Sequence, residues 1–337
     1  MKNINKCPST LKEGYHTYSP GALRNVFKGK KTSHILPYYI SQAKKEQRKL
    51  FTENRVRISI SGVQEKVSLK FEKNILTLTI TDGEYILKPI PKDLDNIEAV
   101  PANEHVTMQL AAQIFNMDVA KNALIFFGDG EQAYITKRFD VMADGRRCLK
   151  EDFASLLNKT SETGNKNYKY EGSYTDIAHA IDLYLPAAAI AKEKLFQLAV
   201  FNYLVSNGDA HLKNFSVIDY LQDGFYDLAP AYDLLCTRLH INDGDFGLKD
   251  ALYEGDFNHT SFSTYGYHAY DDFYDFGIKI GLHPKRIQFF LLKFLSKKAD
   301  TEVLVKRSFL SAEMQNLYLE YFNHKLRRLG TSLSKKI

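Results

Sequence analysis

Residues 204–233 read LVSNGDAHLKNFSVIDYLQDGFYDLAPAYD, and the rest of the chain can be placed around this stretch. An apolar, helix-like run enters it, and a β-like stretch over 215–220 with a turn at 223–224 leads to a proline-marked turn that ends at Asp233. This order predicts a helix, a polar loop, one short strand with a turn after it, and a second polar turn. The polar loop holds Asp209, His211, Lys213 and Asn214.

The oxygen-bearing side chains of this stretch suit phosphoryl transfer. That reaction needs a carboxylate that accepts a hydroxyl proton, and oxygen ligands that hold magnesium on the phosphates. Asp209 and Asn214 are five residues apart, which is the spacing of Asp and Asn in the catalytic loop of protein kinases. Asp233 can supply a second ligand to the metal. Each residue alone could be an ordinary loop or cap residue, but the combination favours a catalytic and metal site.

Longer stretches carry a family resemblance. Residues 207–216, NGDAHLKNFS, and 228–233, LAPAYD, closely resemble the catalytic and metal motifs of HipA-like serine/threonine kinases, the toxin halves of bacterial toxin–antitoxin pairs. Residues 59–66, SISGVQEK, and 85–88, YILK, match two further motifs, and all four follow in family order. The resemblance implies an α+β, two-lobed protein-kinase-like fold, with a β-rich N-lobe over residues 1–137 and a mainly helical C-lobe over residues 138–337.

The resemblance also implies roles for single residues. Asp209 is expected to deprotonate a protein serine or threonine hydroxyl, and Asn214 and Asp233 are expected to hold Mg²⁺. Lys88 is expected to bind the phosphates of ATP. His211 is either a buried neutral histidine that braces the loop or a contact to the nucleotide, and Lys213 could neutralise charge on the γ-phosphate.

Alternating apolar residues upstream of Lys88 predict strands over 56–60, 67–71, 75–80 and 85–87, which we interpret as an antiparallel meander. Its first turn could be a plain hairpin turn. Its place before a strand lysine favours a loop that covers the phosphates, in which Gly62 allows close approach of the backbone. The residues of this turn are Ser61, Gly62, Val63 and Gln64.

A helix is predicted to begin near Pro101, and it places Glu104 in its first turn. Kinases hold their strand lysine with a helix glutamate, so we expect Glu104 to support Lys88. In HipA-like kinases an Arg-Phe-Asp stretch lies at the hinge, where backbone groups bind adenine. Residues 137–140, KRFD, match it, which implies adenine contacts from the backbone of Lys137 and Phe139, although a buried Phe and a turn Asp are an equal alternative.

Asp245-Phe-Gly247 repeats the letters of the protein-kinase metal motif. It lies within a turn-like segment and far beyond Asp209, so Asp245 is not expected to bind metal. Residues 157–175 are polar and without periodicity, which predicts a long loop. The spacing predicts helices over 195–205, 283–295 and 311–329, the last with Ser311 as N-cap.

In HipA-like kinases a serine just before the glycine-containing loop is autophosphorylated, which switches the kinase off. Ser59 matches that position, and Ser61 adds a second hydroxyl beside Gly62. A phosphate brings a charge of about −1.5 to −2, which would repel ATP. The alternative is that both serines simply point outward from a strand.

The amino-acid composition is that of an ordinary globular protein and excludes few classes of function. The 337 residues include 44% hydrophobic and 25% charged residues with a net charge of +5, as in a globular protein that needs no nucleic-acid surface. Cys7, Cys148 and Cys236 are far apart and lack metal-binding spacing, so reduced thiols in the cytoplasm are expected. The N-terminus lacks the apolar core of a signal peptide, and no apolar run is long enough to span a membrane.

Longer HipA-like proteins carry an extra N-terminal subdomain before the phosphate loop, and here Ser59 comes too early for it. The chain resembles the short kinases of three-component systems, so the expected partners are a helix-turn-helix DNA-binding antitoxin and a small protein that supplies this subdomain. DNA would be reached only through the antitoxin. The resemblance makes aminoacyl-tRNA synthetases the first candidate substrates. A small-molecule phosphotransferase and a catalytically silent pseudokinase scaffold stay open as alternatives.

Overall fold

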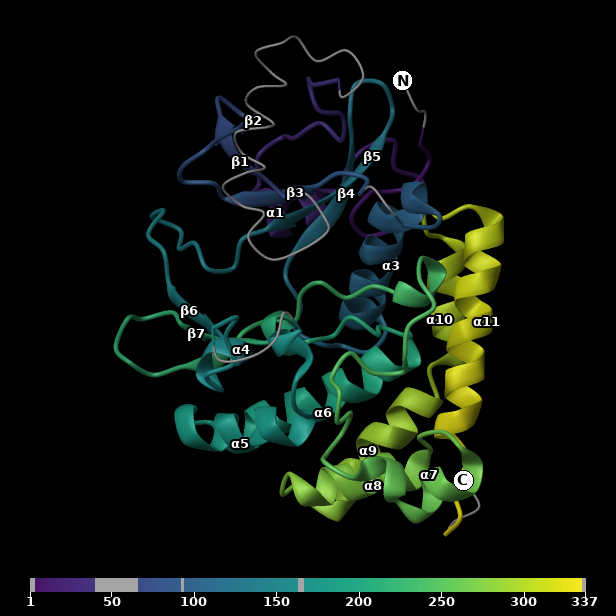
Figure 1. The fold of residues 1–337 in the computed structure, drawn as a ribbon. Helices are drawn as coiled ribbons and strands as arrows, with labels where there is room; N and C mark the ends of the chain where they lie inside the picture. The colour runs from purple at the N-terminus through teal and green to yellow at the C-terminus, as the bar shows by residue number, and fades with distance from the viewer. Residues whose placement is uncertain (1–3, 40–65, 92–93, 163–166, 335–337) are drawn as a thin grey trace.

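The computed structural model describes residues 4–39, 66–91, 94–162 and 167–334. A sheet-rich part and a helix-rich part lie one above the other (Figure 1), which confirms the predicted α+β, two-lobed arrangement. None of the described helices is both long and apolar enough to cross a membrane.

A five-stranded antiparallel sheet forms the upper lobe. Its strand order is β2-β1-β3-β5-β4. Alternation of side chains turns Val67, Leu87 and Ile135 to one face, where they join a cluster with Phe27 from the segment after α1 (Pro20–Asn25). The strands are β1 (Val67–Glu72), β2 (Ile75–Leu78), β3 (Tyr85–Lys88), β4 (Asn122–Phe126) and β5 (Gln132–Lys137).

The predicted meander is wrong in its strand order. β3 pairs with β1 and not with β2, so β1 lies between them, although every pairing is antiparallel as expected. A period of two tells which face a side chain takes, but not which strand lies beside which. Burial explains the outcome, because Val67 and Leu69 of β1 are fully buried whereas Ile75 of the edge strand β2 is exposed. The strand predicted over 56–60 lies outside the described residues.

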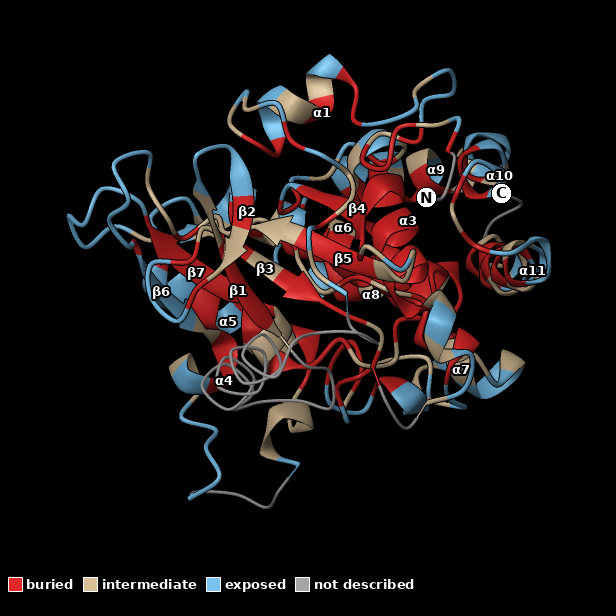
Figure 2. Ribbon diagram, turned by 90° about the horizontal axis from the view of Figure 1, so that it is seen from above, coloured by how far each residue is buried: buried red, intermediate tan, exposed pale blue. Residues whose placement is uncertain are grey.

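Helix α3 (Val100–Gln113) lies under the sheet and is buried on nearly all sides. Figure 2 shows it in red beside β4 and β5. Helix α11 runs alongside it (Figure 1), and the hydroxyls of Thr107 and Tyr318 meet at 3.0 Å. One large apolar cluster joins α3 to the helices below, so the division at residues 137/138 stays a prediction.

The lower lobe is mainly helical, as predicted. Helix α6 feeds directly into the loop that holds Asp209, and Ser311 caps α11 with its side chain, also as predicted. The helices are α4 (Phe153–Leu156), α5 (Tyr174–Tyr184), α6 (Ala188–Leu204), α7 (Thr260–Tyr265), α8 (Tyr270–Lys279), α9 (Pro284–Leu295), α10 (Lys298–Lys306) and α11 (Ala312–Leu329).

A small antiparallel sheet, β6-β7-β8, holds the two polar segments of the 204–233 stretch in place. Its strands are β6 (Leu149–Asp152), β7 (Ser216–Asp219) and β8 (Asp227–Leu228), of which only β7 was predicted. The Asp219 carboxylate accepts hydrogen bonds from four successive backbone N–H groups, over 221–224, which fixes the hairpin turn. Ala231 is tied to residues 118 and 120 by backbone hydrogen bonds, which sets the turn before Asp233.

Candidate active site

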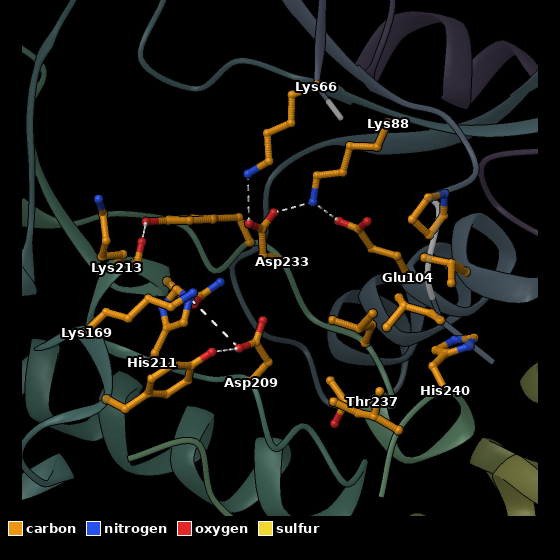
Figure 3. Close-up of a pocket in the computed structure, with 18 of the residues that line it drawn as sticks. Lys66, Lys88, Glu104, Lys169, Asp209, His211, Lys213, Asp233, Thr237 and His240 are labelled. Carbon is orange, nitrogen blue, oxygen red and sulfur yellow. Dashed lines mark hydrogen bonds and ion pairs between the residues drawn. The ribbon is translucent and has the colours of Figure 1, made fainter. Parts of the chain in front are cut away.

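A cavity of about 430 Å³ gathers residues of the upper lobe, of α3 and of the 204–233 stretch. Figure 3 shows Asp209 and Asp233 near its centre, with Lys169 and Lys213 on one side and Thr237 and His240 on the other. Seven residues singled out from the sequence line it: Lys88, Glu104, Asp209, His211, Lys213, Asn214 and Asp233.

Lys88 is the centre of a buried charge cluster. Its ammonium lies 2.6 Å from the Glu104 carboxylate and 2.5 Å from that of Asp233 (Figure 3). Burial alone would lower the pKa of Lys88, but the two carboxylates outweigh it and raise that pKa. Burial raises the pKa of Glu104 to about 7 against the opposing charge of Lys88. The contact expected between Lys88 and Glu104 is therefore present, with the lysine held charged.

Lys66 reaches the same carboxylate from the other side, with its Nζ 3.4 Å from Asp233 Oδ2. Burial would raise the pKa of Asp233, but Lys66 and Lys88 lower it below the usual range, so this carboxylate is ionised. Lys66 ends the SISGVQEK motif, and sequence reasoning gave it no role. The remaining motif positions, Ser59 and Ser61 to Gln64, lie outside the described residues.

Asp209 extends from the loop after α6, and its side chain is 44% exposed. The Tyr170 hydroxyl donates to its Oδ1 at 2.6 Å. The loop itself is braced because Gly208 N–H donates to Thr237 Oγ1 at 2.8 Å. A Cβ at Gly208 would collide with the side chain of Asp243, so only glycine fits this close approach. The backbone beside Asp209 is thus held in place, while the carboxylate stays partly exposed to solvent.

His211 is buried, and burial lowers its pKa to about 4. A neutral, buried imidazole agrees with one of the two expectations for this residue, while contact with a nucleotide stays a prediction. Lys213 Nζ lies 3.4 Å from the Tyr168 hydroxyl, and its carbonyl accepts a hydrogen bond from Tyr232. Its ammonium therefore stays at the cavity, where it can meet an anionic ligand.

Asn214 and Asp233 fit the requirements of a magnesium site. Mg²⁺ prefers hard oxygen ligands and is usually held by one or two protein side chains together with phosphate oxygens. Asn214 Oδ1 is buried and has no hydrogen-bond partner among the described residues. Asp233 is ionised and has a backbone φ of +56°, a sparsely populated conformation that is common at functional sites. Within the described chain, no group of three or more His, Cys, Asp or Glu side chains could hold a metal ion by itself, so phosphate oxygens would have to complete the coordination of Mg²⁺ here.

Asp245 does not line this cavity. Its carboxylate forms ion pairs with Lys325 and, at 3.3 Å, with Arg328 of α11. Gly247 packs on the catalytic loop so closely that a Cβ there would collide with the backbone of Ala210. Residues 245–247 therefore have a packing role in this chain, in agreement with the expectation that Asp245 is not a metal ligand.

Lys137 and Phe139, the expected hinge residues, are not among those lining the cavity. The Lys137 N–H donates to the carbonyl of Lys121 at 2.7 Å, so this donor is already used. The Phe139 ring lies 5.6 Å from that of Tyr232, which does line the cavity. Adenine contacts from these two backbones stay a prediction.

Sequence reasoning missed several residues of the site. Tyr170 and Lys169 come from a polar stretch without periodicity, and no signal in the sequence could have placed them. Thr237 and His240 follow Asp233 closely, so proximity in the chain could have suggested them. The missed lining residues include Lys66, Lys150, Asp152, Lys169, Tyr170, Thr237 and His240.

Comparisons with known proteins find relatives over most of the chain. Residues 58–307 match the family model described as HipA-like C-terminal domain. A Haemophilus influenzae protein named "Putative kinase" is 28% identical over 338 residues, which cover 96% of this chain and 95% of that protein. The serine/threonine-protein kinase toxin HipA of Shewanella oneidensis is 27% identical over 56% of this chain, and the match spans 45% of the toxin.

Solved structures show the same fold. A chain in the Shewanella oneidensis complex of HipA, HipB and operator DNA superposes with a TM-score of 0.61 at 19% identity, covering 88% of this chain and 72% of that chain. The Helicobacter pylori proinflammatory kinase CtkA superposes with a TM-score of 0.51 at 15% identity, covering 78% and 90%. These identities are low, so the structures speak for the kinase-like fold alone, which they confirm.

Proposed function

Because the chain belongs to the family of the HipA-like C-terminal domain, we propose that it is a serine/threonine-protein kinase that transfers the γ-phosphate of ATP to a protein hydroxyl. One observation carries this proposal. The residues expected to serve catalysis, metal binding and phosphate binding come from three separate segments and line one cavity, namely Lys88, Asp209, Asn214 and Asp233.

In the proposed reaction the hydroxyl oxygen of the acceptor attacks the γ-phosphorus, the bond from that phosphorus to ADP breaks, and the hydroxyl proton passes to Asp209. The half-exposed carboxylate of Asp209 suits this role, because a base must come within hydrogen-bond reach of the proton it removes. Lys88, held by Glu104, binds the phosphates. Mg²⁺ held by Asn214 and Asp233 would neutralise charge on the phosphates.

The position of Lys66 supports a phosphate-binding role for the SISGVQEK segment. It lies against Asp233 and lines the cavity, so the end of that segment reaches the site. We propose that Ser59 and Ser61 are autophosphorylated and that the added charge, about −1.5 to −2 each, excludes ATP. Mass spectrometry of the wild type beside Asp209→Asn tests this: phosphate on these serines only in the wild type supports it, and equal phosphate in both opposes it.

We further propose that the kinase is the toxin of a toxin–antitoxin system, acting inside the cytoplasm. The related Shewanella protein is named a kinase toxin, and the matched structure contains HipA with HipB and operator DNA. This supports a helix-turn-helix antitoxin as partner, with DNA contacted only through it. The chain matches 95% of the length of the Haemophilus influenzae relative and 45% of that of the Shewanella toxin, and a small protein as a second partner is part of the same proposal.

Phosphoproteomics of cells that express the wild type, beside cells that express Asp209→Asn, tests the substrate class. New phosphoserine or phosphothreonine on a protein, with an aminoacyl-tRNA synthetase as the first acceptor to check, supports the proposal. Phosphate transfer to small molecules alone, with no new phosphoprotein, would replace it with a small-molecule phosphotransferase. Mg·ATP binding without transfer to any acceptor would replace it with a pseudokinase scaffold.

A further inference from the structure

A second cavity, of about 280 Å³, lies between helix α11 and the chain that enters the catalytic loop. Its buried floor contains Ser206 and Lys325, and Arg327 and His324 stand exposed at its rim. Neither the kinase proposal nor the family comparisons use these residues. The side chains that matter for its chemistry are those of Ser206, Arg238, His324, Lys325, Arg327 and Arg328.

The cavity is cationic. Asp245 pairs with Lys325 and Arg328, and Asp243 lies near Arg238. Glu320 at the exposed rim is the remaining carboxylate. Within the described chain neither Arg238 nor Arg327 forms a salt bridge, so two guanidinium groups are left for an anion from solution.

Ser206 is an independent sign of a ligand. It is 2% exposed, and its Oγ has no hydrogen-bond partner among the described residues. A buried hydroxyl without a partner is unfavourable, and an acceptor bound in the cavity would satisfy it. Its backbone φ of +54° is unusual for serine and marks the position as constrained.

Two arginines of this cavity are held in place by rings. The Arg238 guanidinium lies 5.8 Å from the centre of the Tyr321 ring, and that of Arg328 lies 4.7 Å from the centre of the Tyr267 ring. A guanidinium that is already oriented loses less freedom when it binds, and its planar fork matches phosphate oxygens.

We propose that this cavity binds a single phosphoryl group, as inorganic phosphate or a small phosphate monoester. Arg238 and Arg327 supply the free charge, and Ser206 Oγ donates a hydrogen bond. The volume lies at the lower end of the range usual for ligand pockets, which is about 300–1,000 Å³, so the cavity has room for phosphate or a small ester.

The site is joined to the catalytic loop through Thr237, which Figure 3 shows at the edge of the first cavity. Thr237 donates from its N–H and its Oγ1 to the Ser206 carbonyl, at 3.1 and 3.0 Å. The same Oγ1 accepts from Gly208, next to Asp209. A bound phosphate would therefore stiffen the segment on which the proposed base is mounted.

The test is a calorimetric titration of inorganic phosphate into the full-length protein, at constant ionic strength and without nucleotide. The wild type should show saturable binding. The double variant Arg238→Gln/Arg327→Gln should need at least tenfold more phosphate, and Ser206→Ala should need several-fold more. Ser206→Ala guards against misfolding, because its hydroxyl bonds to no described residue.

Two controls locate the binding. Arg307→Gln removes an exposed arginine that does not line the cavity, and Lys66→Met removes a cation of the ATP cavity. Both should keep the wild-type midpoint, and phosphoserine should compete if an ester is the ligand. The proposal is overturned if the wild type shows no saturable binding, or if the double variant and Ser206→Ala bind like the wild type. It is also overturned if Lys66→Met abolishes binding, or if only duplex DNA, and not phosphate, binds with this variant pattern.

Discussion

The Tyr170 hydroxyl donates a 2.6 Å hydrogen bond to Oδ1 of Asp209. Burial and this bond to the carboxylate raise the pKa of Tyr170, so the phenol is a neutral donor. It occupies one of the two carboxylate oxygens, either of which could accept the proton of an acceptor hydroxyl. Tyr170 belongs to a short 3₁₀ helix over 168–170, in the stretch predicted to be a long loop.

Tyr170→Phe should therefore increase phosphate transfer, because the acceptor no longer competes with the phenol. A hydrogen bond to a charged group is worth roughly 1.5–3 kcal/mol, so we expect an increase of about tenfold or more in kcat/KM for the acceptor. Tyr168→Phe is the matched control, since Tyr168 contacts Lys213 and not Asp209. A fall in kcat with Tyr170→Phe would mean that the phenol positions the base and does not block it.

Glu104→Gln should lower kcat/KM for ATP by about tenfold or more, because Lys88 loses the carboxylate that holds it toward the phosphates. The amide keeps the shape, so the fold should persist with Asp233 still beside Lys88. Glu98→Gln, an exposed glutamate just before α3, is the control. Steady-state kinetics at varied ATP measure the effect, and wild-type kinetics for Glu104→Gln would remove this residue from the site.

Asp245→Asn should lower the stability of the fold, whereas Asp233→Asn should lower the affinity for Mg·ATP. Without its partner, the ammonium of Lys325 is left buried, so Asp245→Asn should destabilise the fold by about 2–4 kcal/mol and leave Mg·ATP binding intact. Asp233→Asn should weaken Mg·ATP binding much more than it affects folding. Urea unfolding and calorimetric titration measure both, and loss of Mg·ATP binding in a folded Asp245→Asn protein would contradict the assignment.

His105 should make stability depend on pH. It is fully buried, with its Nε2 3.0 Å from the Ser9 carbonyl, and burial lowers its pKa to about 4. Between pH 6.5 and 4 the unfolded chain binds a proton that the folded chain does not, so stability falls as the pH falls, by up to about 3 kcal/mol. Urea unfolding at pH 7.5 and 5 should show a smaller loss for His105→Gln than for the wild type. The exposed His179→Gln should match the wild type, and equal losses in all three proteins would refute the assignment.

Local pattern in the sequence was enough for much of the fold and for part of the site. The spacing of polar residues after an apolar helix placed Asp209 and Asn214, and strand and cap signals placed Lys88 and Ser311 where the structure has them. The predictions that failed concern features that depend on contacts between distant segments of the chain. The pairing of β3 with β1 is set by burial across the sheet. Tyr170 contacts Asp209 from a stretch whose apolar residues show no periodicity.

Transfer of radiolabelled γ-phosphate by Asp209→Asn, measured beside Mg·ATP binding on the same preparation, tests the central claim most directly. Asp227→Asn, an exposed carboxylate on the neighbouring hairpin, is the control. The account predicts that Asp209→Asn binds Mg·ATP like the wild type while its transfer rate falls by roughly 10²–10⁴, as for a lost general base. Transfer by Asp209→Asn at the wild-type rate would contradict it.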